Sequence, residues 1–153
     1  MDFEKRIAEL FIELPDPPRM INKGVVQSVL SGKLLYVGGA LPYIEGKLSF
    51  KGRLGLEVST DQGGMAARHA LSQALSAVRD NVGSLNKIKQ IVQLHGFIAT
   101  GGDFKEHDKV LDPASSLLFD IFGVAGKHAR MVVGVNSLPQ NACLSLTLLV
   151  EIK

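Results

Sequence analysis

The chain is short of cysteine and tryptophan, and it carries no excess of charge of either sign. Among its 153 residues, Cys143 is the single cysteine. It cannot form an internal disulfide, which leaves the cytoplasm as the default compartment. Lys and Arg number 17 against 15 Asp and Glu, for a net charge of +2. The basic residues are scattered along the chain, so the composition argues against a nucleic-acid partner.

Long apolar runs and ligand motifs are also missing. No stretch approaches the roughly 18 apolar residues that cross a membrane, and the acidic start Met1-Asp2-Phe3-Glu4 is unlike a signal peptide. No membrane partner is therefore expected. None of the four histidines forms a His-x-x-x-His pair, which argues against a metal site. Gly123–Gly126 lacks the Gly-Lys-Ser/Thr ending of a phosphate loop, and no cofactor is predicted.

What the chain does contain is a series of periodic segments that fit one hydrophobic core. We divide it into residues 1–19, an N-terminal helix with a Pro-rich connector, and residues 20–153, the main domain. Apolar residues at helical spacing predict the first helix over Asp2–Leu14, which Pro15-Asp16-Pro17-Pro18 ends. Ser31-Gly32 is a plausible hairpin turn between the first two strands. The predicted strands are Val25–Leu30, Lys33–Gly39, a short one near Lys47–Phe50, Lys87–Ala99, Ala129–Asn136 and Ala142–Ile152.

Two longer helices are predicted from their caps. Thr60 or Asp61 caps a helix that runs to about Val82, and Gly83 stops it. Asp112-Pro113 begins the other, which ends around Phe122-Gly123. The charged segment Lys105–Lys109 is interpreted as a solvated loop.

Alternation in the long strands predicts a sheet with one apolar face. In Ala129–Asn136, Met131, Val133 and Val135 oppose Arg130. The apolar sets in the other two long strands are Ile88, Val92, Leu94 and Ile98, and Leu144, Leu146, Leu148, Val150 and Ile152. Two helices could bury these faces, which gives an α+β fold. The mixed faces, where Arg130 and Cys143 are expected, suit an oligomer with wet clefts between subunits.

The end of the chain carries the most specific pattern. Arg130-Met131-Val132-Val133-Gly134-Val135, followed by Leu138-Pro139, resembles the Arg-x-x-V-x-V-x-x-L-P signature of the RidA/YjgF superfamily, which is also labelled L-PSP endoribonuclease. The preceding segment, Phe122–Arg130, is similar to a divergent and mostly uncharacterised branch. The resemblance covers roughly residues 20–152.

This resemblance implies a fold and a chemistry. The fold is similar to chorismate mutase of the bacillus type: a sheet with two helices on one face, here with an extra N-terminal helix. Three subunits form a homotrimer with a central barrel-like core and clefts between neighbours. In better-known members an arginine, here Arg130, binds the carboxylate of a 2-imino acid. Water then hydrolyses the imine to a 2-keto acid and ammonia, so the implied partner is a small carboxylate metabolite.

Other family positions have changed. The family's tyrosine falls at Val25 and its serine at Gly38. Its cysteine falls at Val132, a mild loss because any backbone carbonyl there could hold water. Its late-strand glutamate falls at Ser145, which supplies no carboxylate.

Each candidate has a structural alternative. Arg130 is favoured as the ligand-binding residue over an interface salt bridge, because a guanidinium grips a carboxylate with two parallel hydrogen bonds. Ser115 either lines the cleft or is an ordinary first-turn helix residue. Gly38 and Gly39 either let amides approach a ligand or form a bulge. His128 touches the cleft or, slightly favoured, is a loop residue at a subunit contact.

Three functions compete. The first is hydrolysis of imino or enamino acids at an intersubunit cleft, with Arg130 as the anchor. The second is a non-catalytic trimer that binds or senses a carboxylate metabolite, and the two rank nearly equal. Ribonuclease activity ranks well behind, because the charge is near neutral and no His–His or His–Lys acid/base constellation is present.

Overall fold

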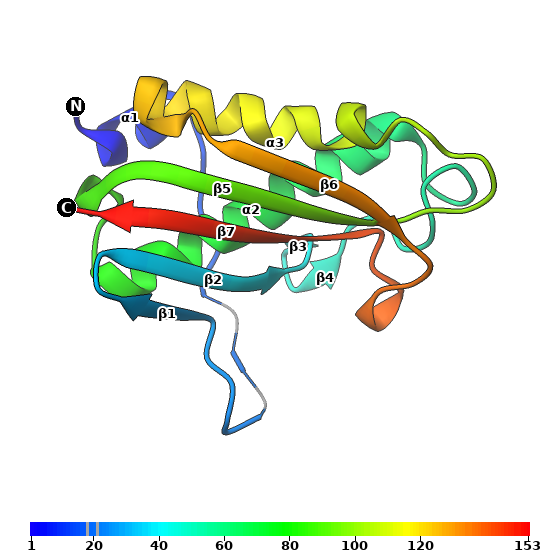
Figure 1. Cartoon of the computed structure of the whole chain (residues 1–153), viewed down its shortest axis with the longest axis horizontal. Coiled ribbons are helices and arrows are strands. Elements are labelled where there is room, and N and C mark those ends of the chain that lie inside the picture. Colours follow the sequence, from blue (N-terminus) through cyan, green and yellow to red (C-terminus); the bar gives the residue numbers. More distant parts are fainter. Residues whose placement is uncertain (18, 21) are drawn as a thin grey trace.

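Five strands form one sheet in the order β1-β2-β7-β5-β6 (Figure 1). This computed structural model describes residues 1–17, 19, 20 and 22–153. All neighbouring strands are antiparallel except β5 and β6. The strands are β1 Ser28–Ser31, β2 Leu34–Ala40, β5 Ile88–Ala99, β6 Ala129–Val135 and β7 Leu144–Ile152, and a separate small hairpin pairs β3 Tyr43–Ile44 with β4 Lys47–Leu48.

The long helix α2, Thr60–Val82, has the predicted bounds but a different cap. Ser59 accepts a hydrogen bond from the backbone of Gln62, and the Gln62 side chain accepts one from the backbone of Ser59. This capping box satisfies two backbone N–H groups that the first turn leaves free. Gly83 ends the helix in the left-handed conformation, with φ of 92°, as glycine commonly does.

Two helix predictions need correction. The first helix, α1, spans Phe3–Glu9 and stops well before Leu14; Phe11, beyond it, has a positive φ of 56°. Of the predicted Pro-rich connector, Pro18 lies outside the described residues. The last long helix, α3, spans His107–Phe122 and therefore begins before Pro113. A proline inside a helix removes one backbone hydrogen bond, and packing over the rest of α3 outweighs that loss.

The predicted loop Lys105–Lys109 is a loop only at Lys105 and Glu106, because His107–Lys109 form the first turn of α3. Glu106 occupies the N-cap position and accepts hydrogen bonds of 2.8 Å from Lys109 Nζ and from Thr60 Oγ1. The bond from Thr60 connects the beginnings of α2 and α3, and both bonds stabilise the charged carboxylate. They also hold the pKa of the Glu106 carboxyl below its ordinary value, with the Lys109 hydrogen bond as the largest cause.

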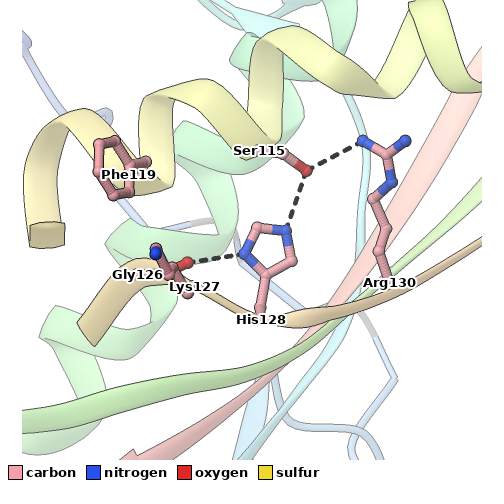
Figure 2. Close-up of a pocket in the computed structure, with 6 residues that line it drawn as sticks. All are labelled: Ser115, Phe119, Gly126, Lys127, His128 and Arg130. Carbon is pink, nitrogen blue, oxygen red and sulfur yellow. Dashed lines mark hydrogen bonds between the residues drawn. The ribbon is translucent and has the colours of Figure 1, made fainter. Parts of the chain in front are cut away.

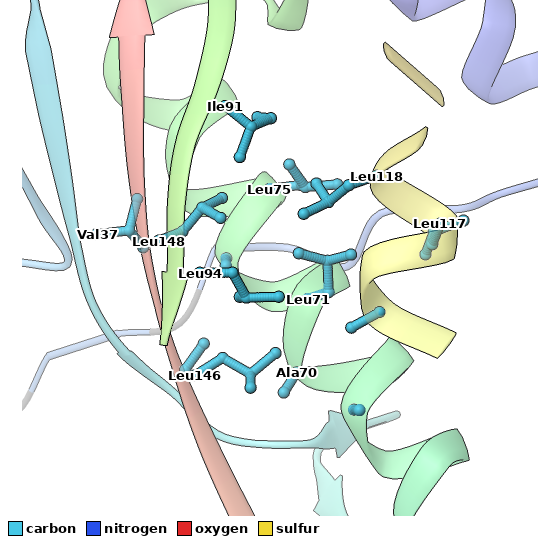
Figure 3. Close-up of a cluster of buried hydrophobic side chains, with 14 of the residues drawn as sticks. Val37, Ala70, Leu71, Leu75, Ile91, Leu94, Leu117, Leu118, Leu146 and Leu148 are labelled. Atoms are coloured by element: carbon cyan, nitrogen blue, oxygen red, sulfur yellow. The ribbon is translucent and has the colours of Figure 1, made fainter. Parts of the chain in front are cut away.

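The core lies between the sheet and the pair α2 and α3 (Figure 3). The apolar face of β7 is buried as predicted. In β5, Ile88, Leu94 and Ile98 are buried as predicted, but Val92 is not. Register shifts interrupt the pairing of β5 with β7 between Ile88 and Gln90 and again between Ile91 and Gln93. An extra residue at a bulge reverses the faces beyond it, so Ile91 is buried in place of Val92. Cys143 is also fully buried in the core, where a mixed-face position was expected.

The orientation of β6 is opposite to the prediction. Met131 and Val133 pair with His95 and Phe97 and are 56% and 38% exposed. Arg130 pairs with Leu94, a core residue that is 0% exposed, and so lies on the face covered by the helices. Because β6 is an edge strand, the long side chain can cover apolar surface and still hold its charged end near water.

The other face of the sheet carries no helix (Figure 1). It presents several exposed or half-exposed apolar side chains: Val29, Tyr36, Phe97, Met131, Val133 and Leu149. We call this surface the open face. Within the described part of the chain, no helix is long and apolar enough to span a membrane.

Candidate functional site

A pocket of about 330 Å³ opens where the edge strand β6 meets α3 (Figure 2). The short 3-10 helix η2, Gly123–Gly126, leads from the end of α3 into this strand. The residues that line the pocket come from these three segments and from the two residues that join η2 to β6: Ser115, Phe119, Gly126, Lys127, His128 and Arg130.

The chain turns from α3 into β6 at Gly126, and this turn places His128 in the pocket. A Cβ atom at residue 126 would overlap the backbone carbonyl of Leu118 in α3. Glycine therefore lets η2 pack directly on the helix, and β6 starts within reach of the helix side chains. Lys127, between Gly126 and His128, extends over the ring of Phe119, with 6.0 Å from Nζ to the ring centroid.

Ser115 and His128 form a directed hydrogen-bond chain (Figure 2). His128 Nδ1 lies 2.7 Å from the carbonyl oxygen of Gly126, and Nε2 lies 2.9 Å from Ser115 Oγ. A carbonyl oxygen only accepts, so the network assigns the proton to Nδ1. In the neutral imidazole Nε2 is then the acceptor, and the Ser115 hydroxyl donates to it.

Arg130 contacts the same serine and two acids of α3. Its Nη1 donates to Ser115 Oγ at 3.1 Å and to Asp112 Oδ1 at 2.8 Å, and its Nη2 donates to Asp108 Oδ1 at 2.9 Å. The arginine side chain is 21% exposed, whereas the side chains of Asp108 and Asp112 are 79% and 59% exposed. The positive charge is thus shielded on the pocket side and balanced by carboxylates on the solvent side.

The structure brings together three of the predicted site residues: Ser115, His128 and Arg130. Ser115 lies in the middle of α3 and not in its first turn, because the helix starts at His107. The predicted mixed-face position of Arg130 is wrong, since its side chain points to α3. Whether these residues bind a ligand stays a prediction.

The other predicted site residues lie elsewhere. Gly38 and Gly39 sit where the pairing of β2 with β7 changes register, which fits the bulge interpretation. A Cβ at Gly39 would lie 3.0 Å from Ser145 Oγ, so these two are neighbours. Ser145 pairs with Phe97 on the open face. Val132 packs against the core on the helix side. Two strands, β7 and β5, separate β2 from β6.

Sequence reasoning missed four side chains around the pocket: Asp108, Asp112, Phe119 and Lys127. The spacing of Asp108 and Asp112 was a usable signal, because residues four apart share one face of a helix. The interpretation of 105–109 as a loop hid it.

Two other reactive groups, the Cys143 thiol and the pair Ser49 and His69, are not among the residues that line this pocket. Burial raises the pKa of the Cys143 thiol to about 11, which leaves it protonated and unreactive near neutral pH. His69 Nδ1 lies 3.0 Å from Ser49 Oγ. Burial, and secondarily the charge of Arg68, lower the pKa of His69.

The similarity to known proteins extends over most of the chain. Residues 4–152 match the family described as "YjgF/chorismate_mutase-like, putative endoribonuclease". Protein TCP17 of Trypanosoma cruzi is 35% identical over 128 residues, which cover 83% of this chain and 80% of that protein.

Two solved structures are also similar. Atu1372 of Agrobacterium tumefaciens, a protein of unknown function, is 36% identical, with a TM-score of 0.89 over 98% of this chain and 91% of that one. A Shewanella oneidensis protein described as a "putative endoribonuclease" is 33% identical, with a TM-score of 0.95 over 99% and 100% of the two chains. The chain therefore belongs to the YjgF/chorismate mutase-like family, to which its Arg130–Pro139 segment is similar.

Proposed function

We propose that the chain binds a small carboxylate metabolite at Arg130 and hydrolyses 2-imino acids there to 2-keto acids and ammonia. One observation carries the proposal: the Arg130 guanidinium, the Ser115 hydroxyl and His128 Nε2 meet in one pocket. The Arg130 guanidinium can bind a carboxylate, and His128 Nε2 is a base in the same pocket.

The two aspartates do not prevent binding. Exposed ion pairs contribute only about 0–1 kcal/mol each, and both carboxylates are more than half exposed. A ligand carboxylate held by two parallel hydrogen bonds and shielded from water gains about 1.5–3 kcal/mol. The ligand therefore displaces an aspartate, or binds the guanidinium N–H groups that the aspartates and Ser115 do not use.

The hydrolysis needs water and a base. Water adds to the imine carbon and passes a proton to His128 Nε2, directly or through Ser115 Oγ. With the imine nitrogen protonated, this addition gives a neutral carbinolamine. His128 returns its proton to the carbinolamine nitrogen, ammonia leaves, and the hydroxyl proton passes to His128 as the carbonyl of a 2-keto acid forms. In this scheme His128 replaces the glutamate that the family places at the position of Ser145.

We also propose that three copies assemble through their open faces, with a barrel-like centre and clefts between subunits. The exposed Met131 and Val133 and the neighbouring Phe97 support this, because adjacent exposed apolar side chains mark an interface. A neighbouring subunit would then complete the pocket at β6. The cytoplasm stays the expected location.

The second candidate is a trimer that binds a carboxylate without chemistry. A specific observation favours it: Ser145, at the family's glutamate position, has no carboxylate and lies on the face of the sheet opposite Arg130. Ribonuclease activity is not proposed.

The test follows the disappearance of 2-imino acids generated in situ by an amino-acid oxidase. We expect the wild type to accelerate hydrolysis and Arg130→Ala to lose at least ~10-fold of that acceleration, because the substrate anchor is gone. Lys109→Ala is the matched control, since this neighbouring cation pairs with Glu106 and not with the pocket. Thermal unfolding checks that Arg130→Ala is folded.

A wild type that does not accelerate hydrolysis would reject the deaminase proposal. The binding proposal is then tested by calorimetric titration with pyruvate. Saturable binding to the wild type that Arg130→Ala abolishes supports the second candidate, and no binding to either rejects it.

A further inference from the structure

Ser115 departs from the usual behaviour of a serine inside a helix. Such a hydroxyl usually points to solvent or donates to the backbone carbonyl four residues earlier, as Ser72 in α2 does to Arg68 at 3.0 Å. Ser115 in α3 is directed instead to His128 Nε2 at 2.9 Å. Its hydroxyl is therefore committed to a base and not to its own helix.

In the second serine–histidine pair, Ser49 and His69, the hydrogen bond runs from the histidine to the serine. The Ser49 hydroxyl donates to the carbonyl of Pro42 at 2.9 Å. Its single proton is then occupied, so the neutral His69 must donate from Nδ1 to Ser49 Oγ. His69 cannot act as a base on that serine, whereas His128 is oriented to act as one on Ser115.

The backbone carbonyl of Gly126 holds the His128 imidazole in its orientation. The Gly126 carbonyl holds His128 Nδ1 at 2.7 Å, and the turn behind it is closed by the Lys127 N–H donating to Val124 at 3.1 Å. A nucleophile bonded to a base that is itself oriented by an acceptor is the arrangement of an activated serine. The carbonyl here takes the place that a carboxylate has in hydrolases.

Positive charge lies next to the serine oxygen. Arg130 Nη1 donates to Ser115 Oγ at 3.1 Å, and Lys127 lines the same pocket. A cationic donor at this position stabilises negative charge on Ser115 Oγ as its proton moves to His128.

The geometry points to Ser115 as a nucleophile that accepts acyl groups from small esters, with His128 as its general base. Ser115 Oγ attacks the ester carbonyl carbon while its proton moves to His128 Nε2. The bond to the alcohol oxygen breaks, and the alcohol leaves with that proton. Water then attacks the acyl-serine, again with His128 as the base, and releases a carboxylic acid and Ser115.

The pocket is large enough for a small acyl group. Its volume is about 330 Å³, and Phe119, 49% exposed, supplies one apolar wall. Acetyl and other short acyl chains fit this space. The inference does not rest on imine hydrolysis, which needs no covalent intermediate.

The test uses 4-nitrophenyl acetate, with release of 4-nitrophenolate and the intact mass of the protein as the two measurements. We expect an initial burst, a mass gain of one acetyl group and a modified peptide that contains Ser115. Ser115→Ala should lose the burst and the label, and His128→Gln should slow acylation by about 100-fold or more. Ser116→Ala and His69→Gln should behave as the wild type, since Ser116 is the exposed neighbour of Ser115.

Ser115→Cys keeps a nucleophile of similar size and should still be acylated, which separates a loss of chemistry from a loss of folding. Acetylation that persists in Ser115→Ala, or a wild type labelled only at Lys127 or the N-terminus, would overturn the inference. A normal rate of imine hydrolysis by Ser115→Ala, together with loss of the acyl label, would support this nucleophile role and leave the deaminase proposal intact.

Discussion

The guanidinium of Arg130 lies 2.8 Å from the carboxylate of Asp112 on the neighbouring helix. The residue that would bind a substrate carboxylate is thus already paired within its own chain. A ligand carboxylate must replace Asp112 or share the guanidinium with it. Asp112 is therefore expected to lower the affinity of the site for the ligand.

Replacement of this acid should tighten ligand binding. In Asp112→Asn we expect the Kd for pyruvate to fall by about two- to fivefold, because an exposed ion pair of up to about 1 kcal/mol no longer competes. Calorimetric titration measures the change. Glu106→Gln is the control, since this acid contacts Lys109 and Thr60 and not Arg130. Equal affinity in Asp112→Asn and the wild type would show that Asp112 does not limit access.

The tight turn at Gly126 should be intolerant of any side chain. Gly126→Ala would press a methyl group onto the Leu118 backbone, and backbone cannot rotate away. We expect a loss of about 3 kcal/mol in the free energy of unfolding, measured by urea denaturation. Gly96→Ala meets the movable side chain of Leu111 at 2.8 Å, so its cost should be smaller. The reverse order of the two variants would contradict this account.

His69 should make stability depend on pH. Burial first, and the charge of Arg68 second, lower its pKa from the ordinary value of 6.5 in the folded chain. Below pH 6.5 the unfolded chain therefore binds more protons than the folded one, and the free energy of unfolding falls as the pH drops toward the lowered pKa. Above pH 6.5 His69 is neutral in both states, so its full contribution to the free energy of unfolding is present.

The variant His69→Gln removes this titration. Its unfolding free energy, measured by urea denaturation from pH 7 down to pH 5, should fall less steeply than that of the wild type. His69 keeps its contact with Ser49 at neutral pH, so the two proteins should differ most at pH 7. Parallel curves would show that His69 titrates normally in the folded chain.

The buried thiol of Cys143 should be inert in the native protein. Burial raises its pKa to about 11, so at pH 8 only about one molecule in a thousand carries the reactive thiolate. Reaction with a disulfide reagent such as 5,5′-dithiobis(2-nitrobenzoate) should become fast only in denaturant. Rapid native labelling, at the rate of a free thiol, would mean that the strand opens.

The open face should be the surface through which copies assemble. Met131→Asp places a charge at its exposed edge and should shift the protein to the monomer, as measured by size-exclusion chromatography with light scattering. Val124→Asp is the matched control, because Val124 is 80% exposed and lies in η2, outside the sheet. A wild type that is monomeric by itself would reject the trimer proposal.

The sequence was most informative where local chemistry decides the structure. The bounds of α2 followed from its periodicity and from Gly83, because capping and helix propensity act over a few neighbouring residues. The choice of Arg130 as a candidate followed from its motif. By contrast, Pro113 suggested a helix start that the structure places at His107, because tertiary packing of α3 outweighs one missing hydrogen bond.

The face prediction held for β7 but failed for β6 and for one residue of β5, and the failure has a physical cause. Alternation shows which residues share a face but not which face a helix covers. A bulge exchanges the two faces; in β5 two register shifts flank Ile91, so Ile91 is buried in place of Val92 and the predicted pattern resumes at Leu94. In β6, Met131 and Val133 form the more apolar set, yet they lie on the open face.

The sequence by itself determined the family signature, the α+β class and the presence of an arginine suited to carboxylates. These depend on residue identity and on spacings of a few residues. Only the tertiary structure decided that Arg130 meets Ser115 and His128, and that Asp108 and Asp112 pair with it. These contacts join α3 to β6, and their geometry is fixed by the parallel register of β6 on β5 and by the close turn at Gly126. No local pattern encodes that register, because it results from packing the whole sheet against its helices.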